Sequence, residues 1–359
     1  MRLAFDATSL TAAGKGIARF QKEFLRAAAE HDLIADLDVF VPTEPDTEAL
    51  PERPGWRYHP VSTRPMILWE QVRRPALARR LRVDVVLTPS ERAALWGPPE
   101  VVYIYEHPKY RTRRSREVGT STRQRAVDLS TLLLFRLAMR RAALVVAASG
   151  STARDIGTDR VVYSGVSAEF TPAAEPRDYL LHIASDDPRD NSEVLVDAYA
   201  EYGAGAPPLI IAGPIRSARP KLEERARTRG VDNRIEWRGF QSGQDLVRLY
   251  RGAVAYVDPS LYEGFGLQAA EALACGTPVI ASNRTSLPEV VGDGGILLDP
   301  DDVHGFASAM RRVVEDRALA EELGARAVAQ AARFTWERTV RELLEACAEI
   351  VSPRDARLA

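Results

Sequence analysis

The sequence predicts an α/β protein of two domains, each built on a parallel sheet covered by helices. The chain has 359 residues, which is long for a single hydrophobic core. Short apolar runs alternate with segments of helical period, the pattern typical of parallel sheets. A turn-rich stretch over residues 165–177, with Pro172 and Pro176, divides this alternation into two series. We therefore expect one domain over residues 1–172 and a second over residues 173–336.

The first series begins with a strand and a glycine-containing turn, followed by a helix over residues 17–29. Ile17, Phe20, Phe24 and Ala28 share one face of that helix. Further buried strands are expected downstream. The expected strands of this half are residues 2–6, 39–41, 83–87, 101–105, 144–147 and 161–163.

The second series repeats the alternation with greater regularity. Its final helices are expected between residues 303 and 349. The expected strands are residues 179–184, 208–212, 235–238, 253–258 and 278–281, and the expected helices are residues 192–202, 221–229, 244–251 and 267–274.

Composition narrows the class of protein. A formal net charge of −2 argues against a surface dedicated to nucleic acid. Cys275 and Cys347 lack metal-ligand spacing and favour a reducing cytoplasm. The most apolar stretch, residues 129–148, contains three arginines, so we expect a short amphipathic helix and a buried strand rather than a membrane span. No signal peptide is expected, because Met1 leads directly into a strand pattern; work at the inner membrane face stays open, as does the oligomeric state.

Residues 258–281 contain the sequence features that indicate a ligand site. They read as a strand, a turn bracketed by Gly264 and Gly266, a helix from Leu267, a tight turn and another strand. Glycines let the backbone approach a ligand, and the amides at a helix N-terminus favour a diphosphate. Glu263 and Glu271 flank this turn, and carboxylates accept hydrogen bonds from hydroxyl pairs. The pattern predicts a sugar-nucleotide site.

This segment resembles the signature of retaining glycosyltransferases of family 4. That resemblance implies a GT-B fold, with two facing Rossmann-like domains, an interdomain cleft, and a C-terminal helix over residues 337–359 that crosses back to the first domain. The matching strings are Ser-Leu-Tyr-Glu-Gly-Phe-Gly, Ala-Cys-Gly-Thr-Pro-Val-Ile-Ala-Ser, Ser286-Leu287-Pro288-Glu289-Val290, Gly14 to Phe20, Trp69-Glu70-Gln71, Gly239 with its following helix, and Phe334-Thr335-Trp336.

The resemblance also implies roles for particular residues. Glu263 would hold the donor sugar and Glu271 the ribose, while the first domain would bind the acceptor. The other implied donor contacts are Gly16, Gly239, Gly264, Phe265, Gly266 and Leu267. The overall resemblance is nearest to mannosyltransferases that use GDP-mannose, and a UDP-sugar donor stays open.

Two positions depart from the family pattern. Asp190 stands where many relatives carry a lysine, and a carboxylate there would repel a diphosphate. Arg189 would then supply the positive charge, or another basic residue or Mg²⁺ would; no motif indicates a metal. Many relatives also have a cleft histidine, whose place is taken here by Tyr105 or, after a loop shift, by His107.

Other features of the sequence are weaker signals of function. The basic loop over residues 105–125, which includes Lys109, is expected either to be a solvated loop or to meet a polar acceptor. Asp36-Leu37-Asp38 spells a DxD, which here is expected to be surface charge. The sequence thus favours a retaining hexosyltransferase acting on an oligosaccharide or glycoconjugate hydroxyl. A different enzyme on a similar fold and a non-catalytic nucleotide-sugar or glycan-binding homologue are the alternatives.

Overall fold

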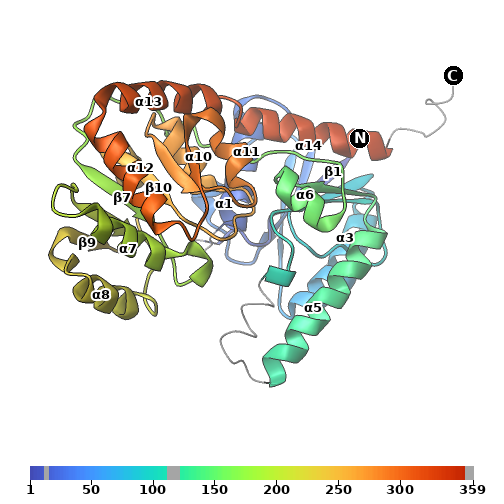
Figure 1. The fold of residues 1–359 in the computed structure, drawn as a ribbon. Helices are drawn as coiled ribbons and strands as arrows, with labels where there is room; N and C mark the ends of the chain where they lie inside the picture. Colours follow the sequence, from blue (N-terminus) through green and yellow to red (C-terminus); the bar gives the residue numbers. More distant parts are fainter. Residues whose placement is uncertain (12–15, 111–121, 352–359) are drawn as a thin grey trace. The chain divides into compact units, whose positions relative to one another are not determined.

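A computed structural model describes residues 1–11, 16–110 and 122–351 of the chain. The chain divides into two compact units, Met1–Gly165 with Trp336–Ala359 and Val166–Thr335 (Figure 1). We call these the N-terminal unit and the C-terminal unit and describe each by itself.

The N-terminal unit is built on a six-stranded parallel sheet of order β3-β2-β1-β4-β5-β6. Its central strands are wholly buried and rich in valine and leucine, as expected of a sheet covered on both faces. The strands are β1 (Leu3–Asp6), β2 (Leu37–Pro42), β3 (Trp56–Val61), β4 (Val85–Thr88), β5 (Glu100–Ile104) and β6 (Leu144–Ala147). The helical segments are α1 (Ile17–Glu30), η1 (Thr47–Ala49), α2 (Met66–Leu68), η2 (Trp69–Arg73), α3 (Arg74–Arg80), α5 (Thr122–Arg141), α6 (Gly150–Ile156) and α14 (Trp336–Val351).

The C-terminal unit repeats this plan with the order β12-β11-β10-β7-β8-β9, again parallel throughout. The strands are β7 (Tyr179–Ile183), β8 (Leu209–Ala212), β9 (Ile235–Arg238), β10 (Ala253–Asp258), β11 (Val279–Ser282) and β12 (Gly295–Leu298). The helical segments are η3 (Pro188–Asp190), α7 (Ser192–Tyr202), α8 (Arg219–Thr228), η4 (Asp232–Arg234), α9 (Gly243–Arg251), α10 (Leu267–Ala274), α11 (Leu287–Val291), η5 (Gly292–Gly294), α12 (Val303–Glu315) and α13 (Arg317–Ala331).

Both sheets have the strand order of a Rossmann fold, which confirms the predicted α/β class. In such sheets the chain direction of the crossovers reverses between the first and fourth strands. These are β1 and β4 in the N-terminal unit and β7 and β10 in the C-terminal unit. Ligands bind beyond the carboxyl ends of the strands at this switch point, so the loops that follow these four strands are the first place to look for a site.

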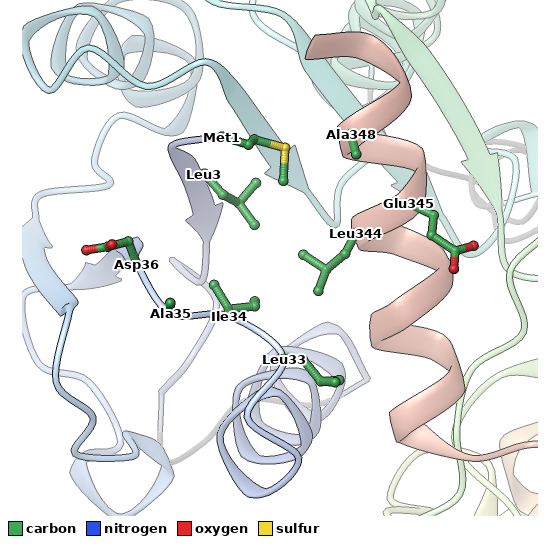
Figure 2. Close-up of a pocket in the computed structure, with 9 residues that line it drawn as sticks. All are labelled: Met1, Leu3, Leu33, Ile34, Ala35, Asp36, Leu344, Glu345 and Ala348. Atoms are coloured by element: carbon green, nitrogen blue, oxygen red, sulfur yellow. The ribbon is translucent and has the colours of Figure 1, made fainter. Parts of the chain in front are cut away.

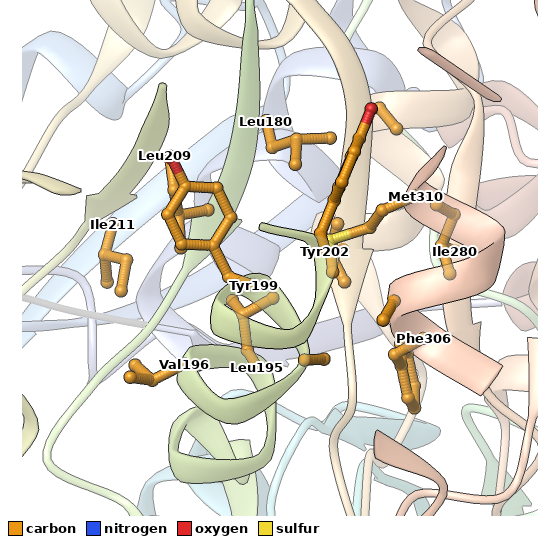
Figure 3. Close-up of a cluster of buried hydrophobic side chains, with 14 of the residues drawn as sticks. Leu180, Leu195, Val196, Tyr199, Tyr202, Leu209, Ile211, Ile280, Phe306 and Met310 are labelled. Carbon is orange, nitrogen blue, oxygen red and sulfur yellow. The ribbon is translucent and has the colours of Figure 1, made fainter. Parts of the chain in front are cut away.

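Helix packing on the sheets explains why the elements form where they do. In the C-terminal unit, Leu180 of β7, Leu195 of α7 and Phe306 of α12 meet in one buried cluster (Figure 3). In the N-terminal unit, Phe24 of α1 stacks on Phe5 of β1 with ring centroids 4.3 Å apart. The apolar faces of these helices are therefore buried against the sheets, and candidate site residues are expected at the ends of the strands.

Three expectations about secondary structure are wrong. Residues 161–163 form no strand of the sheet, because Val161 makes only an isolated bridge to Ala147. The expected short amphipathic helix is α5, a helix of 20 residues. The edge strands β3 and β12 were missed; β3 carries Arg57, His59 and Pro60, which an edge strand tolerates.

Candidate functional site

The loops that follow β7 and β10 lie together at the switch point of the C-terminal unit. The Leu261 N–H donates to the Arg189 carbonyl at 2.8 Å. The Asn191 side-chain amide donates to the Pro259 carbonyl at 3.1 Å and to the Pro300 carbonyl at 2.9 Å. Backbone contacts between loops fix their separation, so residues 184–191 and 259–266 form one framework.

The N-terminus of α10 opens onto this framework. Gly266 precedes the helix with φ 89° and ψ 50°, in the left-handed region that favours glycine. As the N-cap residue it has no side chain that could accept a hydrogen bond from the first-turn amides. A Cβ at Gly266 would lie 3.0 Å from Cδ2 of Leu287. The backbone amides of the first helical turn at Leu267 are those that a helix leaves without intrahelical acceptors. The geometry suits an anion such as a diphosphate.

Glu263 sits in the loop between β10 and α10 and is half-buried. Its backbone is held from both sides: its N–H donates to Oγ1 of Thr285 at 3.0 Å, and Oγ of Ser286 donates to its carbonyl at 2.9 Å. A clamped backbone limits the positions that the carboxylate can reach. The residue is thus held next to the start of α10, and its expected contact with the donor sugar stays a prediction.

Glu271 lies on the second turn of α10 and is 1% exposed. The Tyr250 hydroxyl donates to its Oε2 at 3.1 Å, and Oγ1 of Thr277 donates to the Tyr250 carbonyl at 2.7 Å. Tyr250 in turn lies edge-on to Phe170. The carboxylate is therefore positioned by a buried tyrosine, and its expected contact with the ribose stays a prediction.

Arg189 joins the two loops through its side chain as well as its backbone. Its guanidinium pairs with Asp187 at 2.9 Å and lies 5.6 Å from the ring centroid of Tyr262. The cation therefore lies at the switch point, with its charge partly balanced by a neighbouring carboxylate, and its expected role toward the diphosphate stays a prediction. Its proposed contact with a leaving diphosphate would compete with Asp187 for the same guanidinium.

The carboxylate of Asp190 is hydrogen-bonded within its own loop. Its Oδ2 accepts hydrogen bonds from the Ser185 N–H at 2.5 Å and from Oγ of Ser185 at 2.8 Å. Burial raises the pKa of the Asp190 carboxyl, opposed by these hydrogen bonds. The carboxylate thus has a local partner within the turn, and its expected repulsion of a diphosphate stays a prediction.

The other expected donor contacts are spread along the carboxyl edge of the sheet. Phe265 is buried and packs edge-on against Phe334, with centroids 5.4 Å apart, so its side chain belongs to the core. Gly239 follows the edge strand β9, and its carbonyl accepts the Gly213 N–H at 3.2 Å. Gly264 is half-buried in the turn before α10. Phe265 and Gly264 therefore lie in the loop at the switch point, and Gly239 lies two strands away from it.

The remaining candidates lie in the N-terminal unit at its carboxyl edge. Gly16 precedes α1 with φ 28°, and a Cβ there would meet no atom within 4 Å. Tyr105 follows β5 and packs edge-on against Phe20 at 5.4 Å. Burial raises its hydroxyl pKa well above the ordinary value, which favours the neutral phenol, and its expected contact with an acceptor stays a prediction.

His107 and Lys109 are both held by local partners. The Lys109 N–H donates to Nδ1 of His107 at 2.9 Å, and the imidazole lies 4.7 Å from the ring of Phe135. Burial, together with the Lys109 charge, lowers the pKa of His107, which favours the neutral ring. The Lys109 ammonium pairs with Asp155 at 2.7 Å, so an acceptor contact would have to share it. The rest of the basic loop, residues 111–125, lies outside the residues whose side chains are described.

Sequence reasoning missed a buried carboxylate at the N-terminal switch point. Glu70 of η2 is 4% exposed, and its Oε1 lies 3.3 Å from Nε of Arg92. Burial raises the pKa of Glu70 to about 7, against the opposing charges of Arg92 and Arg74. The signal was present in the Trp69-Glu70-Gln71 string, but its burial depends on the neighbouring ion pair of Arg74 with Asp6 at 2.7 Å.

Two further features lie away from the carboxyl edges. Asp38 of the DxD string is fully buried in β2 and pairs with Arg57 at 2.9 Å and with His59 at 2.8 Å, so it is structural rather than surface charge. A cavity of about 420 Å³ lies at the amino end of β1, between Leu3, Ile34 and Leu344 of α14 (Figure 2). It is at the opposite end of the sheet from the candidate residues.

Residues 167–330 match the family model described as "Glycosyl transferases group 1". That range contains both loops at the switch point and the whole of α10. Residues 167–330 form a group 1 glycosyltransferase domain. This match agrees with the glycosyltransferase resemblance of the sequence, while the narrower assignment of the chain to family 4 stays a prediction.

Curated proteins are similar to part of this chain. The chain is 38% identical over 172 residues to O-antigen chain mannosyltransferase B of Escherichia coli, covering 47% of this chain and 45% of that protein. It is 37% identical over 155 residues to D-inositol 3-phosphate glycosyltransferase of Salinispora tropica, covering 42% and 32%. The alignments thus span less than half the length of these curated relatives.

A solved structure shows that the fold extends over the whole chain. Sucrose-phosphate synthase from Thermosynechococcus elongatus superposes with a TM-score of 0.77 at 21% identity, covering 98% of this chain and 99% of that one. At this identity the likeness establishes the fold alone. The expected GT-B class is confirmed by such neighbours and by the two Rossmann-type sheets.

Proposed function

We propose that this protein is a retaining hexosyltransferase that moves a sugar from a nucleotide-sugar donor to a hydroxyl of an oligosaccharide or glycoconjugate. One observation carries the proposal: at the switch point of the C-terminal unit, Gly266 opens the N-terminus of α10 beside the clamped Glu263. This arrangement pairs an anion site with a hydroxyl acceptor, as a sugar diphosphate requires. The glycosyltransferase domain assignment supports the same chemistry.

In the proposed reaction, the bond between the anomeric carbon and the diphosphate oxygen breaks while the acceptor oxygen bonds to the same face of that carbon. The acceptor hydroxyl loses its proton in the same step, to the departing diphosphate oxygen. The first-turn amides of α10 and the Arg189 guanidinium stabilise the negative charge that develops on the leaving diphosphate. Glu263 orients the sugar through its hydroxyls. Positioning and electrostatics carry the rate effect in this scheme, without a protein nucleophile.

GDP-mannose is the donor that we propose, and the acceptor binds the N-terminal unit. Support for mannose comes from the relative named O-antigen chain mannosyltransferase B, which is 38% identical over the aligned region. A peripheral location at the inner membrane face belongs to the same proposal. Among the described residues no helix is long and apolar enough to cross a membrane.

The first test is protection of the purified chain against thermal unfolding by GDP, GDP-mannose, UDP and UDP-glucose, each with and without Mg²⁺. A ligand present at about 100 times its Kd stabilises the folded state by about 2.7 kcal/mol, which is readily measured as a shift in Tm. We expect the guanine nucleotides to give the largest shift. A larger shift with UDP-glucose would indicate a UDP-sugar as the donor and would leave the proposed donor site unchanged.

If no nucleotide shifts the Tm of the natural protein, the proposal is overturned and the protein has no donor site. A nucleotide shift without turnover on any glycan acceptor would instead indicate a non-catalytic nucleotide-sugar-binding homologue. The control is Gly157→Ala, which introduces a side chain at a left-handed position of the N-terminal unit, far in sequence from the nucleotide loops. Its nucleotide shift should equal that of the natural protein.

A further inference from the structure

A group of buried polar side chains lies at the switch point of the N-terminal unit, apart from the proposed donor site. Glu70 is carried by η2, where the backbone takes a π-helical turn between α2 and α3. Such turns within a helix are frequent at functional sites. We call Glu70, Arg74, Thr88 and Arg92, together with Asp6 at the end of β1, the switch-point cluster.

Strand register places Thr88 on the face of the sheet that η2 covers. Ala4 of β1 pairs with Val86 of β4, and both are buried in one cluster with Trp69 of η2. Because side chains alternate along a strand, Asp6 and Thr88, two residues further on, lie on that same face. The ends of β1 and β4 and the π-helical turn therefore meet on one side of the sheet.

Two oxygens of this cluster are buried without a hydrogen-bond partner. Nη1 of Arg74 pairs with Asp6 at 2.7 Å, and its Nη2 donates to the Arg92 carbonyl at 3.1 Å. Among the residues that the structure describes, Oε2 of Glu70 and Oγ1 of Thr88 have no such contact, although these residues are 4% and 0% exposed. Buried polar atoms in native proteins are nearly all hydrogen-bonded, so these two oxygens indicate a bound polar group.

The charges around the two oxygens narrow the chemistry of that group. An anion would be opposed by Glu70 and Asp6, and a cation by Arg74 and Arg92, which favours a neutral compound. A carboxylate accepts hydrogen bonds, and a threonine hydroxyl both donates and accepts, so hydroxyl groups satisfy both side chains. Burial raises the pKa of Glu70, which fits an ionised carboxylate that has too few donors.

Arg92 connects the cluster with solvent. Its Nε lies 3.3 Å from Oε1 of Glu70, and its side chain is 29% exposed, whereas the Glu70 side chain is 6% exposed. Its neighbours Ser90 and Glu91, in the loop after β4, are partly exposed. Long arginine side chains cover the groups beneath them while the charged end stays in water. A rotation of this one side chain would therefore open a path to Glu70.

We infer that Glu70 and Thr88 bind hydroxyl groups of the acceptor, a neutral pyranoside, at the switch point of the N-terminal unit. The inference rests on the proposed function, since it assigns the acceptor role of this unit to named residues. Glu70 accepts a hydrogen bond from one sugar hydroxyl, and Thr88 exchanges one with a neighbouring hydroxyl. The pair holds the acceptor, while α10 and Arg189 act on the donor.

The test uses the methyl α-glycosides of mannose, glucose and galactose as probes, added to the purified full chain with and without GDP. Hydrogen exchange should show that at least one glycoside protects residues 69–74 and 88–94 of the natural protein. Titration of that protection gives the Kd of the glycoside. The Tm shift with GDP alone is measured on the same samples.

Thr88→Val is the sharpest variant, because valine keeps the size of the side chain and removes only the hydroxyl. Replacing a buried hydroxyl that has no partner should leave the Tm equal or higher. The Kd of the glycoside should nevertheless rise about tenfold, as expected for one lost hydrogen bond. Glu70→Gln should also weaken glycoside binding about tenfold or more, because an amide is a weaker acceptor than a carboxylate.

Thr339→Val is the matched control in the same unit. Thr339 of α14 is 1% exposed, and its Oγ1 donates to the Tyr163 carbonyl at 2.7 Å. Removing this satisfied hydroxyl should lower the Tm and leave the Kd of the glycoside unchanged.

Natural protein that no glycoside protects overturns the inference, as does an unchanged Kd in both Thr88→Val and Glu70→Gln. A lower Tm in Thr88→Val with an unchanged Kd would likewise give the hydroxyl a purely structural role. The GDP shift in Tm should be the same in all three variants. Glycoside failure with an intact GDP shift removes only this acceptor site, whereas loss of the GDP shift in the natural protein counts against the proposed function.

Discussion

At the residue scale, the proposed reaction depends most directly on Glu263. Glu263→Gln keeps the size of the side chain but removes the charge that orients donor hydroxyls. We expect kcat to fall roughly 100-fold or more, in the range typical of a lost transition-state contact. The stability should change little, because the backbone contacts to Thr285 and Ser286 do not involve the carboxylate. Donor hydrolysis or transfer to a glycan acceptor measures the effect.

The control for that change is Glu322→Gln on α13, where the glutamate pairs with Arg326 at the surface. Surface ion pairs contribute little, so activity and Tm should both be retained. Full activity in Glu263→Gln would remove this residue from the site.

Asp190 gives a second prediction at the residue scale, because charge repulsion and local structure lead to opposite results. The carboxylate accepts two hydrogen bonds from Ser185 within its loop. Asp190→Ala should therefore cost about 1–3 kcal/mol of unfolding free energy and leave nucleotide affinity equal or weaker. Calorimetric titration with GDP and chemical denaturation give the two values. Tenfold tighter nucleotide binding in the variant would show that the carboxylate repels the diphosphate.

Glu70 predicts a pH dependence of stability. Its folded pKa is raised from 4.5 to about 7 by burial, with Arg92 and Arg74 opposing the shift and Asp6 and Glu91 adding to it. For a carboxyl with a raised pKa, the contribution to stability is complete below about pH 4.5 and is lost as the pH rises through 7. The loss is on the order of 3 kcal/mol, since one pKa unit corresponds to about 1.4 kcal/mol.

Glu70→Gln stays neutral over that whole range, so it should lose this part of the pH dependence. Denaturant unfolding of both proteins at about pH 5 and pH 8 gives the comparison, and the variant should gain relative stability at the higher pH. A difference between the two proteins that does not change with pH would mean that Glu70 ionises at its ordinary pKa.

At the scale of the element, the start of α10 rests on the conformation of Gly266. Gly266→Ala places a Cβ at φ 89° and 3.0 Å from Leu287, so both backbone strain and a close contact oppose it. We expect a loss of about 1–3 kcal/mol of stability and a much smaller nucleotide shift in Tm. Gly157→Ala at the end of α6 has the same left-handed strain at φ 74° with no neighbour within 4 Å. It should lose stability without losing the nucleotide shift, and equal nucleotide effects in both variants would contradict the placement of the site.

At the scale of the whole molecule, the two Rossmann-type units predict where a nucleotide acts. Hydrogen exchange with and without GDP should show the strongest new protection in residues 184–191 and 259–271, the segments at the switch point of the C-terminal unit. Both units contain such a switch point, so the N-terminal unit serves as the internal comparison. Protection centred on the segments that follow β1 and β4 would reverse the proposed roles of the units.

Features that depend on residues close together in the chain could be predicted from the sequence, and features that depend on distant residues could not. Strand β10 and helices α7 and α10 have the expected bounds, because their apolar period and turn glycines are local properties. The turn that carries Glu263 and Gly266 was predicted for the same reason, while the roles of these residues stay predictions. The burial of Glu70 was not predicted, since its ion-pair partner Arg92 follows β4 and the Asp6 that pairs with Arg74 ends β1, and these come together only after β1 and β4 pair.

The sequence by itself determined the α/β class, the alternation of strands and helices, and the glycine-bracketed turn before α10, all of which rest on residues close together in the chain. Only the tertiary structure decided where the charges point. Asp190 turns into its own loop towards Ser185, and Arg189 pairs with Asp187 while spanning the loop from β10. The sequence gives the sign and size of a side chain, whereas its orientation depends on how the loop that carries it is held, here by the contacts of residues 189 and 191 with the distant loop after β10.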